Sequence, residues 1–303
     1  MKKLSRVFIL ILLIIIVAIP SGCSSQNANG QYIIDAKKAK ELIGKENVVL
    51  VDAQNADVYA KEHIKGAANI SRNDIVVNIP YPSMLAPKDV IEDSLGKNGI
   101  SNNTTIIIYD NNDNMDAARL WWTLKVYGHE NMKVISGGLK AMKATKFETT
   151  TDAVKAVPAV YTTKDRNTSL IASIDEVKAQ VNDPKKNVVL LDTRSKKEFD
   201  EGTIPGSILI DYVNNNYKDG TYKSTQDIKI QYIENKITPD KTVIMYCKTS
   251  IRGAQTFLAL YEAGYRNLKL YDGAWVEWSA DKSLPVQVPE GTKKIEPSNK
   301  DNS

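Results

Sequence analysis

Two contrasting patterns meet at one cysteine in the stretch Thr242-Val243-Ile244-Met245-Tyr246-Cys247-Lys248-Thr249-Ser250-Ile251-Arg252-Gly253. The first five residues are mostly apolar and partly β-branched, which predicts a buried strand that ends at Tyr246. From Gly253 to Ala263 apolar residues recur at helical spacing, and Gly264 is expected to end that helix. Cys247 therefore follows a strand and precedes a helix N-terminus, where backbone N–H groups and the helix dipole favour a thiolate.

Cys247 is one of two cysteines in the 303 residues, and Cys23 is assigned below to a lipid anchor. No disulfide within the mature chain is then possible. Lys248 and Arg252 add two positive charges to the loop, and these also favour the thiolate. We therefore expect Cys247 to be a nucleophile. The alternative is a buried, inert thiol, which is common among free cysteines.

The chain contains a second copy of this pattern. Three pairs of segments correspond: Val48–Asp52 with Val188–Asp192, Thr105–Tyr109 with Thr242–Tyr246, and Gly138 with Gly273. The first pair is separated by 140 residues. A repeat of that length indicates duplicated domains rather than a solenoid.

Within each copy, short apolar strands alternate with helical patterns. Residues 35–43 and 173–181 are two such helical patterns, and the second opens with the capping-box residues Ser173 and Glu176. This alternation predicts an α/β fold, in which each domain has a mostly parallel central sheet flanked by helices. We expect the domains and flanking segments as follows: domains at 31–150 and 169–288, a Thr-rich polar linker at 151–168, and a disordered, charged tail at 289–303.

The N-terminus is expected to be a targeting segment. Three basic residues precede an apolar run from Val7 to Ile19, which is shorter than the roughly 20 residues that span a bilayer. That pattern predicts a signal peptide at 1–22. The run Pro20-Ser21-Gly22-Cys23 resembles a bacterial lipoprotein signal, in which the cysteine carries a diacylglycerol. The expected location is the extracytoplasmic face of the cell membrane, with lipid on Cys23 and a polar tether at 23–30.

The alternative interpretation of the N-terminus is an ordinary secretory signal, with a cysteine at its end by chance.

The charge and composition of the chain limit the classes of function that it can have. Residues 1–22 hold three basic residues and no acidic one, so the formal net charge falls from +4 for the whole chain to +1 for the mature chain. Such a balance argues against binding of nucleic acid. The apolar content of 42% and the length favour two domains with sizeable cores.

The second copy resembles the rhodanese-type sulfurtransferases in their two-domain form. Three stretches carry the resemblance: Asp192-Thr193-Arg194-x-x-x-Glu198-Phe199-x-x-Gly202-Thr203-Ile204-Pro205-Gly206, the Tyr246-to-Arg252 loop, and Tyr271-Asp272-Gly273-Ala274-Trp275-Val276-Glu277-Trp278. The resemblance covers residues 31 to about 288, which is nearly the whole mature chain. It implies two rhodanese-like domains, the second of them catalytic.

The resemblance also implies an activity. Cys247 would take the outer sulfur of thiosulfate or a similar donor as a persulfide and pass it to a thiophilic acceptor such as cyanide or a thiol. No cofactor or metal would be needed, and no protein partner is assigned. The substrate-binding residues would be those of the loop: Lys248, Thr249, Ser250, Ile251, Arg252 and Gly253. Ser250 departs from the glycine usual in the family, at a position where positive φ is expected.

Asp192 and Arg194 are expected to support this loop. Asp192 ends a strand, and it either hydrogen-bonds the loop or Arg194, or forms a turn. Arg194 and Glu198 are expected to form a structural ion pair rather than to bind substrate. Lys248 either assists the nucleophile electrostatically or is a solvated surface charge.

The first copy lacks the nucleophile, because Tyr109 is followed by Asp110. The loop at 111–116 is acidic and is expected to be two residues longer than its counterpart. A carboxylate cannot accept sulfane sulfur, so this domain is predicted to be non-catalytic. The acidic loop is interpreted as solvated, with a divalent-cation site as the alternative. Trp121 and Trp122 are expected to pack against the other domain or the sheet.

The two histidines, His63 and His129, both lie in the first copy and are expected to have local structural roles. A Cys–His hydrolase therefore has little support. Three alternatives stay open: a 3-mercaptopyruvate sulfurtransferase, a cysteine-dependent phosphatase or arsenate reductase, and a non-enzymatic sulfur-carrying or binding lipoprotein. The phosphatase loop is one residue longer than the four residues found here between Cys247 and Arg252. The mercaptopyruvate loop has Cys-Gly-Ser/Thr-Gly-Val-Thr in place of the present sequence.

Overall fold

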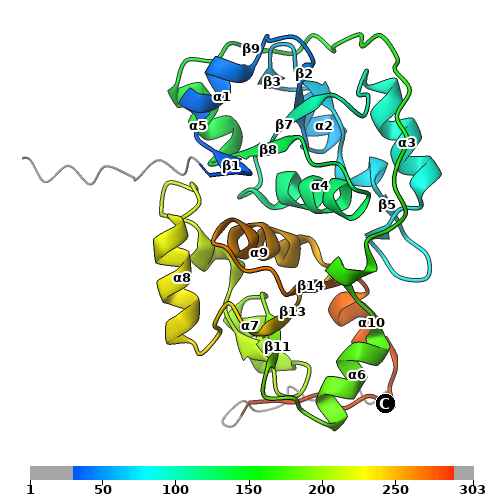
Figure 1. Ribbon diagram of the computed structural model, residues 1–303, viewed down its shortest axis with the longest axis vertical. Coiled ribbons are helices and arrows are strands. Elements are labelled where there is room, and N and C mark those ends of the chain that lie inside the picture. Colours follow the sequence, from blue (N-terminus) through cyan, green and yellow to red (C-terminus); the bar gives the residue numbers. More distant parts are fainter. Residues whose placement is uncertain (1–29, 290–303) are drawn as a thin grey trace, which may run out of the picture.

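The computed structural model describes residues 30–289. The predicted signal peptide at 1–22, the lipid site Cys23, most of the tether and almost all of the predicted tail at 289–303 lie outside the described residues. The described chain forms two α/β domains, one above the other in Figure 1. Among residues 30–289, no helix is both long and apolar enough to cross a membrane.

The first domain is built on a sheet of five parallel strands in the order β1-β8-β7-β2-β4. The strands are β1 (Ile33–Ile34), β2 (Val48–Asp52), β4 (Ala68–Asn69), β7 (Thr105–Tyr109) and β8 (Met132–Ile135), with short pairs β3 (His63–Ile64) with β9 (Thr149–Thr150), and β5 (Val76–Val77) with β6 (Met84–Leu85). The helices are α1 (Ala36–Leu42), α2 (Ala56–Tyr59), α3 (Lys88–Lys97), α4 (Met115–Val126), α5 (Gly138–Ala144) and the 3₁₀ helix η1 (Arg72–Asp74).

The second domain repeats this topology, with parallel strands in the order β10-β14-β13-β11-β12. The strands are β10 (Ile171–Ala172), β11 (Val188–Asp192), β12 (Ile208–Leu209), β13 (Thr242–Tyr246) and β14 (Leu268–Tyr271). The helices are α6 (Ile174–Asn182), α7 (Lys196–Glu201), α8 (Thr225–Glu234), α9 (Ile251–Glu262), α10 (Ala274–Ala280) and the 3₁₀ helices η2 (Thr168–Leu170) and η3 (Tyr212–Asn215). The predicted fold class, two parallel-sheet domains flanked by helices, is confirmed.

Local sequence explains where these elements begin and end. Four of the five residues of β13 are buried, as expected for a strand covered on both faces. Ser173 caps α6 through the predicted capping box with Glu176. Gly264 lies just beyond α9 with φ +95°, a left-handed conformation that costs glycine little.

The two domains pack through their central helices. Helices α4 and α9 lie side by side between the two sheets (Figure 1). Trp121 of α4 packs against Phe257 and Tyr261 of α9, with ring centroids 6.3 and 5.6 Å apart, and Trp122 is fully buried. The prediction that the tryptophan pair serves packing is therefore confirmed.

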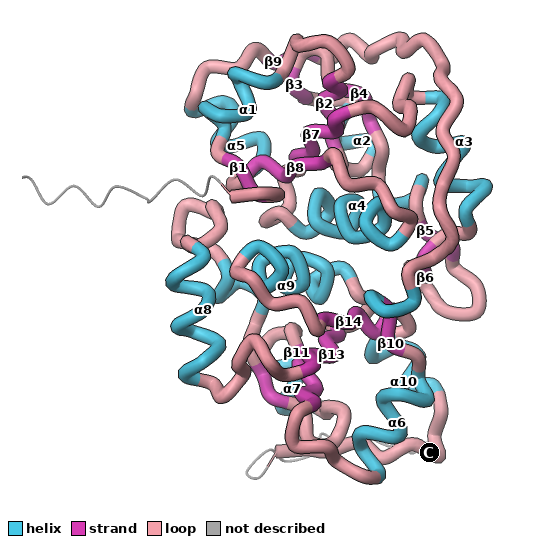
Figure 2. Tube along the Cα trace, viewed as in Figure 1, coloured by secondary structure: helices cyan, strands magenta, loops and turns pink. Residues whose placement is uncertain are grey.

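A long segment without helix or strand, residues 151–167, connects the domains (Figure 2). It runs along α3, where the Ala159 N–H donates to the Gly96 carbonyl oxygen over 2.9 Å. The N–H of Asn167, at its end, donates to the Val126 carbonyl oxygen at the end of α4. The connection is thus fixed to the surface of the first domain.

The residue of the second domain that corresponds to Gly138 differs from the one that the sequence predicted. The Leu139 N–H donates to the Asp110 carbonyl oxygen, as the Trp275 N–H does to that of Cys247. Leu139 therefore corresponds to Trp275, and the preceding residues at positive φ correspond to one another: Gly138 (φ +50°) with Ala274 (φ +56°). The predicted pairing of Gly138 with Gly273 is wrong by one residue, because short local matches do not fix the register of a loop.

Candidate active-site loop

Cys247 directly follows β13 and is 1% exposed. Thr193, which directly follows the neighbouring strand β11, holds the end of β13 in place. Its backbone N–H and its hydroxyl donate to the Tyr246 carbonyl oxygen over 2.9 and 3.0 Å. This contact depends on β11 and β13 being adjacent, with Asp192 opposite Tyr246. The thiol is held at the carboxyl edge of the sheet, where open α/β folds bind ligands.

Helix α10 fixes the carbonyl groups of the loop. The N–H groups of Trp275 and Val276 donate to the carbonyl oxygens of Cys247 and Lys248 over 2.9 and 3.2 Å. Ser250 adopts φ +64°, as predicted for its position, and its hydroxyl donates to the carbonyl oxygen of Asp272. The loop conformation is therefore set by the segment that follows β14.

The N–H groups of the same loop have no such partners. Within residues 30–289, the N–H groups of residues 248–253 donate to no protein acceptor. Three of these residues begin α9, whose first N–H groups have no partner within the helix. Unpaired N–H groups at a helix N-terminus attract anions through hydrogen bonds and the helix dipole.

The first domain shows what such a loop can hold. Asp110, at the place of Cys247, accepts hydrogen bonds from the N–H groups of Asn112, Asn114 and Ala117 over 3.1, 3.1 and 2.9 Å. Asn114 (φ +65°) precedes α4 as Ser250 precedes α9. The first loop is thus filled by its own carboxylate, and burial raises the pKa of that carboxyl to about 6.

The two loops differ in length by one residue. Five residues separate β7 from α4, and four separate β13 from α9. The prediction of a loop two residues longer is wrong. In the acidic loop, Asp116 accepts from the Nε of Arg72 over 2.9 Å. The described part of the chain holds no cluster of three or more potential ligands that could bind a metal ion.

Arg194 and Glu198 do not pair with each other, so that prediction is wrong. Arg194 forms a buried ion pair with Asp192 at 2.6 Å, donates to the Gly202 carbonyl oxygen, and stacks on Trp275 at 4.3 Å. Asp192 also accepts from the Tyr246 hydroxyl over 3.1 Å. The expected hydrogen bond of Asp192 to Arg194 is present. The Nε and Nη2 groups of Arg194 are thus both engaged within the protein.

Arg252 lies beside the sulfur and takes Glu198 as its partner. Its Nη1 and Nη2 donate to the two carboxylate oxygens of Glu198 over 2.6 and 2.7 Å. Burial lowers the pKa of Arg252, but the ion pair and the nearby Cys247 sulfur raise it further, and the net shift is upward. Sequence reasoning missed this pair, since the two residues are separated by 54 positions.

The remaining loop residues have different surroundings. Lys248 is exposed and Thr249 is half-buried, whereas Ile251 is buried. Gly253 lies against the sheet, where an added Cβ would come within 2.7 Å of the Leu270 side chain. Glycine there allows the first turn of α9 to approach the sheet closely.

Both histidines have structural partners, as predicted. The ring nitrogens of His63 lie 2.8 and 3.1 Å from the carbonyl oxygens of Tyr59 and Asp152. His129 contacts the Thr104 carbonyl oxygen and the Tyr161 hydroxyl, each over 3.1 Å. Neither ring belongs to the Cys247 loop.

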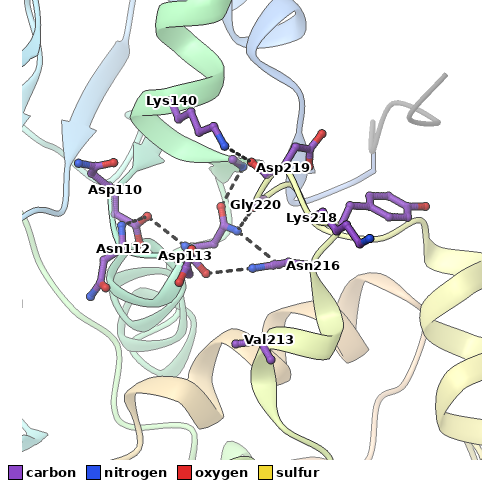
Figure 3. A pocket seen from close by; sticks show the side chains of 13 residues that line it. Asp110, Asn112, Asp113, Lys140, Val213, Asn216, Lys218, Asp219 and Gly220 are labelled. Atoms are coloured by element: carbon purple, nitrogen blue, oxygen red, sulfur yellow. Dashed lines mark hydrogen bonds between the residues drawn. The ribbon is translucent and has the colours of Figure 1, made fainter. Parts of the chain in front are cut away.

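A polar cavity of about 240 Å³ lies where the first-domain loop meets residues 213–220 of the second domain (Figure 3). Asp110, Asn112 and Asp113 line one side. Lys140 lies on another side, and its Nζ donates to the Asp219 carbonyl oxygen over 3.2 Å. Cys247 is not among its lining residues, so this cavity belongs to the loop without a thiol.

The comparisons with known proteins agree with this geometry. The family model described as "Rhodanese-like domain" matches residues 35–145 and 173–281. The chain belongs to the rhodanese family. Each match contains one copy of the strand–loop–helix unit, and the second contains Cys247.

Several curated relatives carry sulfurtransferase names. A "Putative thiosulfate sulfurtransferase" of Mycobacterium tuberculosis is 29% identical over 280 residues, covering 86% of this chain and 99% of that protein. One of the same name from Haloferax volcanii is 30% identical and covers 77% and 86%. "Thiosulfate/3-mercaptopyruvate sulfurtransferase 2" of Arabidopsis thaliana is 27% identical and covers 75% of each chain. These rhodanese relatives indicate a sulfurtransferase acting on small-molecule sulfur donors and acceptors.

Solved structures share the fold over most of this chain. The wild-type structure of EanB superposes with a TM-score of 0.74 at 22% identity, covering 85% of this chain and 69% of that one. A structure of the anaerobic ergothioneine biosynthesis enzyme from Chlorobium limicola gives the same TM-score and identity, and covers 85% and 70%. At this identity the likeness shows the fold alone.

Proposed function

We propose that this member of the rhodanese family moves sulfane sulfur from thiosulfate, or a donor of the same type, through a persulfide on Cys247 to a thiophilic acceptor. In the first step the Cys247 thiolate attacks the outer sulfur of the donor. The S–S bond of thiosulfate breaks, and sulfite leaves with the bonding electron pair. No proton is transferred, so no histidine is required.

In the second step the acceptor attacks the terminal sulfur of the persulfide. Cyanide would leave as thiocyanate, and a thiolate as its own persulfide, and the Cys247 thiolate is restored in both cases. Negative charge is present on the sulfur throughout. The unpaired N–H groups of residues 248–253 and the guanidinium of Arg252 supply hydrogen bonds and positive charge for it.

One observation carries the proposal. The N–H groups of the loop bind a carboxylate in the first domain, whereas those of the corresponding loop in the second domain have no acceptor within residues 30–289. Loop N–H groups hold the Asp110 carboxylate in the first domain. Their counterparts around Cys247 donate to no acceptor within residues 30–289. An anionic donor or persulfide supplies the missing acceptor. This supports one reactive site per chain, in the second domain.

The test is intact-mass spectrometry of the mature protein, residues 23–303, after incubation with thiosulfate. The expected result is a gain of one sulfur atom, release of one equivalent of sulfite, and reversal by cyanide. Cys247→Ser should abolish the gain. Asp110→Asn, in the other loop, is the matched control and should keep it. Absence of the adduct with every donor tried would refute the proposal.

The alternatives predict other outcomes. A relative named for both thiosulfate and 3-mercaptopyruvate supports testing the second donor, which would release pyruvate while the same adduct forms. Turnover of p-nitrophenyl phosphate without any adduct would favour a phosphatase. If neither reaction occurs and Cys247→Ser keeps the cellular role, a binding lipoprotein is the better description.

We also propose export as a lipoprotein, with residues 1–22 removed and lipid on Cys23. This rests on the sequence alone, since both lie outside the described residues. Labelling of cells with an alkyne fatty acid should mark the wild-type protein and not a Cys23→Ser variant. An unlabelled, membrane-free wild-type protein would instead indicate an ordinary secretory signal.

A further inference from the structure

Glu198 binds the guanidinium of Arg252 with both of its carboxylate oxygens. The two hydrogen bonds, 2.6 and 2.7 Å long, form the bidentate geometry in which an arginine–carboxylate contact is strongest. The bond from Arg252 holds the pKa of the Glu198 carboxyl down at about 2, although burial opposes it. Glu198 is therefore negatively charged at every pH at which the protein would be assayed.

The carboxylate is held in place by its own helix. Glu198 is the third residue of α7, and it accepts from the N–H and the hydroxyl of Ser195 over 3.1 and 2.8 Å. Helix α7 follows β11, the strand adjacent to β13, so this carboxylate lies beside the Cys247 loop. The same oxygen, Oε2, thus accepts from both Ser195 and Arg252.

A second carboxylate lies near the same guanidinium. Burial raises the pKa of Asp211, and the charges of Arg252 and Glu198 both act on it. The other cation of the loop, Lys248, is exposed and forms no ion pair among residues 30–289. The positive charges of Lys248 and Arg252 are thus opposed by Glu198, Asp211 and the reacting thiolate.

The negative charges around the loop affect which sulfur donors the site can bind, because they repel a dianion more strongly than a monoanion. Thiosulfate carries two negative charges, and each is repelled by a fixed carboxylate at short range. A sulfane donor with one negative charge suffers about half of that repulsion. It can still use the loop N–H groups, because those groups respond to hydrogen-bond acceptors as well as to charge.

We propose that Glu198 is a specificity-determining residue, which withdraws the charge of Arg252 from the donor and makes the site favour monoanionic sulfane donors over dianionic ones. Organic persulfides and thiosulfonates are the matching chemical class. The inference rests on the proposed function, because it requires Cys247 to accept sulfane sulfur.

The test compares two donors of similar shape, thiosulfate and methanethiosulfonate. With the latter, the thiolate attacks the outer sulfur, the S–S bond breaks, and methanesulfinate leaves with the electron pair. The measured quantity is the ratio of kcat/KM for thiosulfate to kcat/KM for methanethiosulfonate, with cyanide as acceptor. Glu198→Gln keeps the shape and an acceptor for Ser195 but removes the charge. It should raise the ratio by about fivefold or more.

Two control variants separate charge from structure. Glu198→Asp keeps the charge and should leave the ratio within about twofold of wild type. Glu176→Gln removes a capping-box carboxylate of α6 that pairs with Lys269 of β14 in the same domain, and should leave the ratio unchanged. An unchanged ratio in Glu198→Gln, or an equal change in Glu176→Gln, overturns the inference.

A measurement on the wild-type protein keeps the inference falsifiable if Glu198→Gln does not fold. Salt screens the repulsion, so raising the ionic strength should increase the ratio. A ratio that falls with salt would mean that the site attracts dianions, and would overturn the inference. Failure of the proposed function is a different result, because then neither donor leaves a sulfur atom on Cys247.

Discussion

Arg119 of the first domain and Asp272 of the second form a buried ion pair, with 2.8 Å between Nη1 and Oδ1. The second oxygen of Asp272 accepts from the Leu85 N–H over 2.6 Å, and Arg119 also donates to the Ser83 carbonyl oxygen. The backbone carbonyl of the same Asp272 accepts the Ser250 hydroxyl. The domain without a thiol therefore holds, through one residue, the loop that carries Cys247.

Asp272→Asn is expected to lower the free energy of unfolding by about 3–5 kcal/mol, because it leaves the Arg119 guanidinium buried without its counter-charge. Urea denaturation at pH 7 measures this. Lys38→Gln, which removes the exposed pair with Glu41, is the control and should change the midpoint little. Equal midpoints for Asp272→Asn and wild type would contradict a stabilising role of the pair.

Asp110→Asn should change how stability depends on pH. Burial raises the pKa of Asp110 to about 6 from an ordinary 3.8, so the native state binds this proton more tightly than the unfolded state. Its contribution to the free energy of unfolding is greatest below pH 3.8 and falls as the pH rises to about 6, by about 3 kcal/mol in all.

The measurement is urea denaturation of both proteins between pH 4 and pH 7.5. Carboxylates with lowered pKa, such as Glu198, have the opposite slope, but they are common to both proteins and cancel in the difference. The advantage of wild type over Asp110→Asn should therefore shrink as the pH rises. Parallel curves would show that the carboxyl is not buried as described.

Ser250→Gly should change stability by less than about 1 kcal/mol. Glycine relieves the roughly 1–2 kcal/mol cost of a left-handed conformation, but it loses the hydrogen bond to Asp272, which is worth about 1 kcal/mol. Ser250→Val loses the same hydrogen bond and places a β-branched side chain in the left-handed conformation, so it should destabilise by more than about 2 kcal/mol. Thermal unfolding and sulfur loading of Cys247 provide the two measurements, and similar behaviour of the variants would contradict the argument.

Arg194→Lys should act on stability and not on substrate binding. A lysine cannot reproduce the fork to Asp192, the bond to Gly202 and the stacking on Trp275, so a loss of about 3 kcal/mol is expected. The KM for the sulfur donor of the folded variant should stay within about twofold of wild type. A large rise in KM at unchanged stability would instead make Arg194 a substrate ligand.

Much of the fold could be predicted from sequence because its signals are local. The apolar runs Val48–Asp52 and Val188–Asp192 form the strands expected from them, and the capping-box residue Ser173 marks the start of α6. Positive φ at Ser250 was expected from the family resemblance, because glycine is usual at this loop position, and the structure has φ +64° there. Such features depend on residues only a few positions apart.

Loop length and register were less predictable. The one-residue difference between the two loops and the pairing of Gly138 with Ala274 depend on which backbone groups meet, as the hydrogen bonds to Asp110 and Cys247 show. A single sequence offers several alignments of a short loop that fit almost equally well. The pairing of backbone groups in space selects one of them.

The sequence by itself determined two copies of one α/β unit, a single cysteine at a strand end, and an aspartate at the same place in the other copy. Only the tertiary structure decided the distant partners of the charged side chains, Arg252 with Glu198 and Arg119 with Asp272. It also left Asp192, and not Glu198, as the ion-pair partner of Arg194. The physical reason is the sheet order. Because β11 lies next to β13, residues 54 positions apart meet at one edge, and a charge pairs with whichever opposite charge that packing brings within reach.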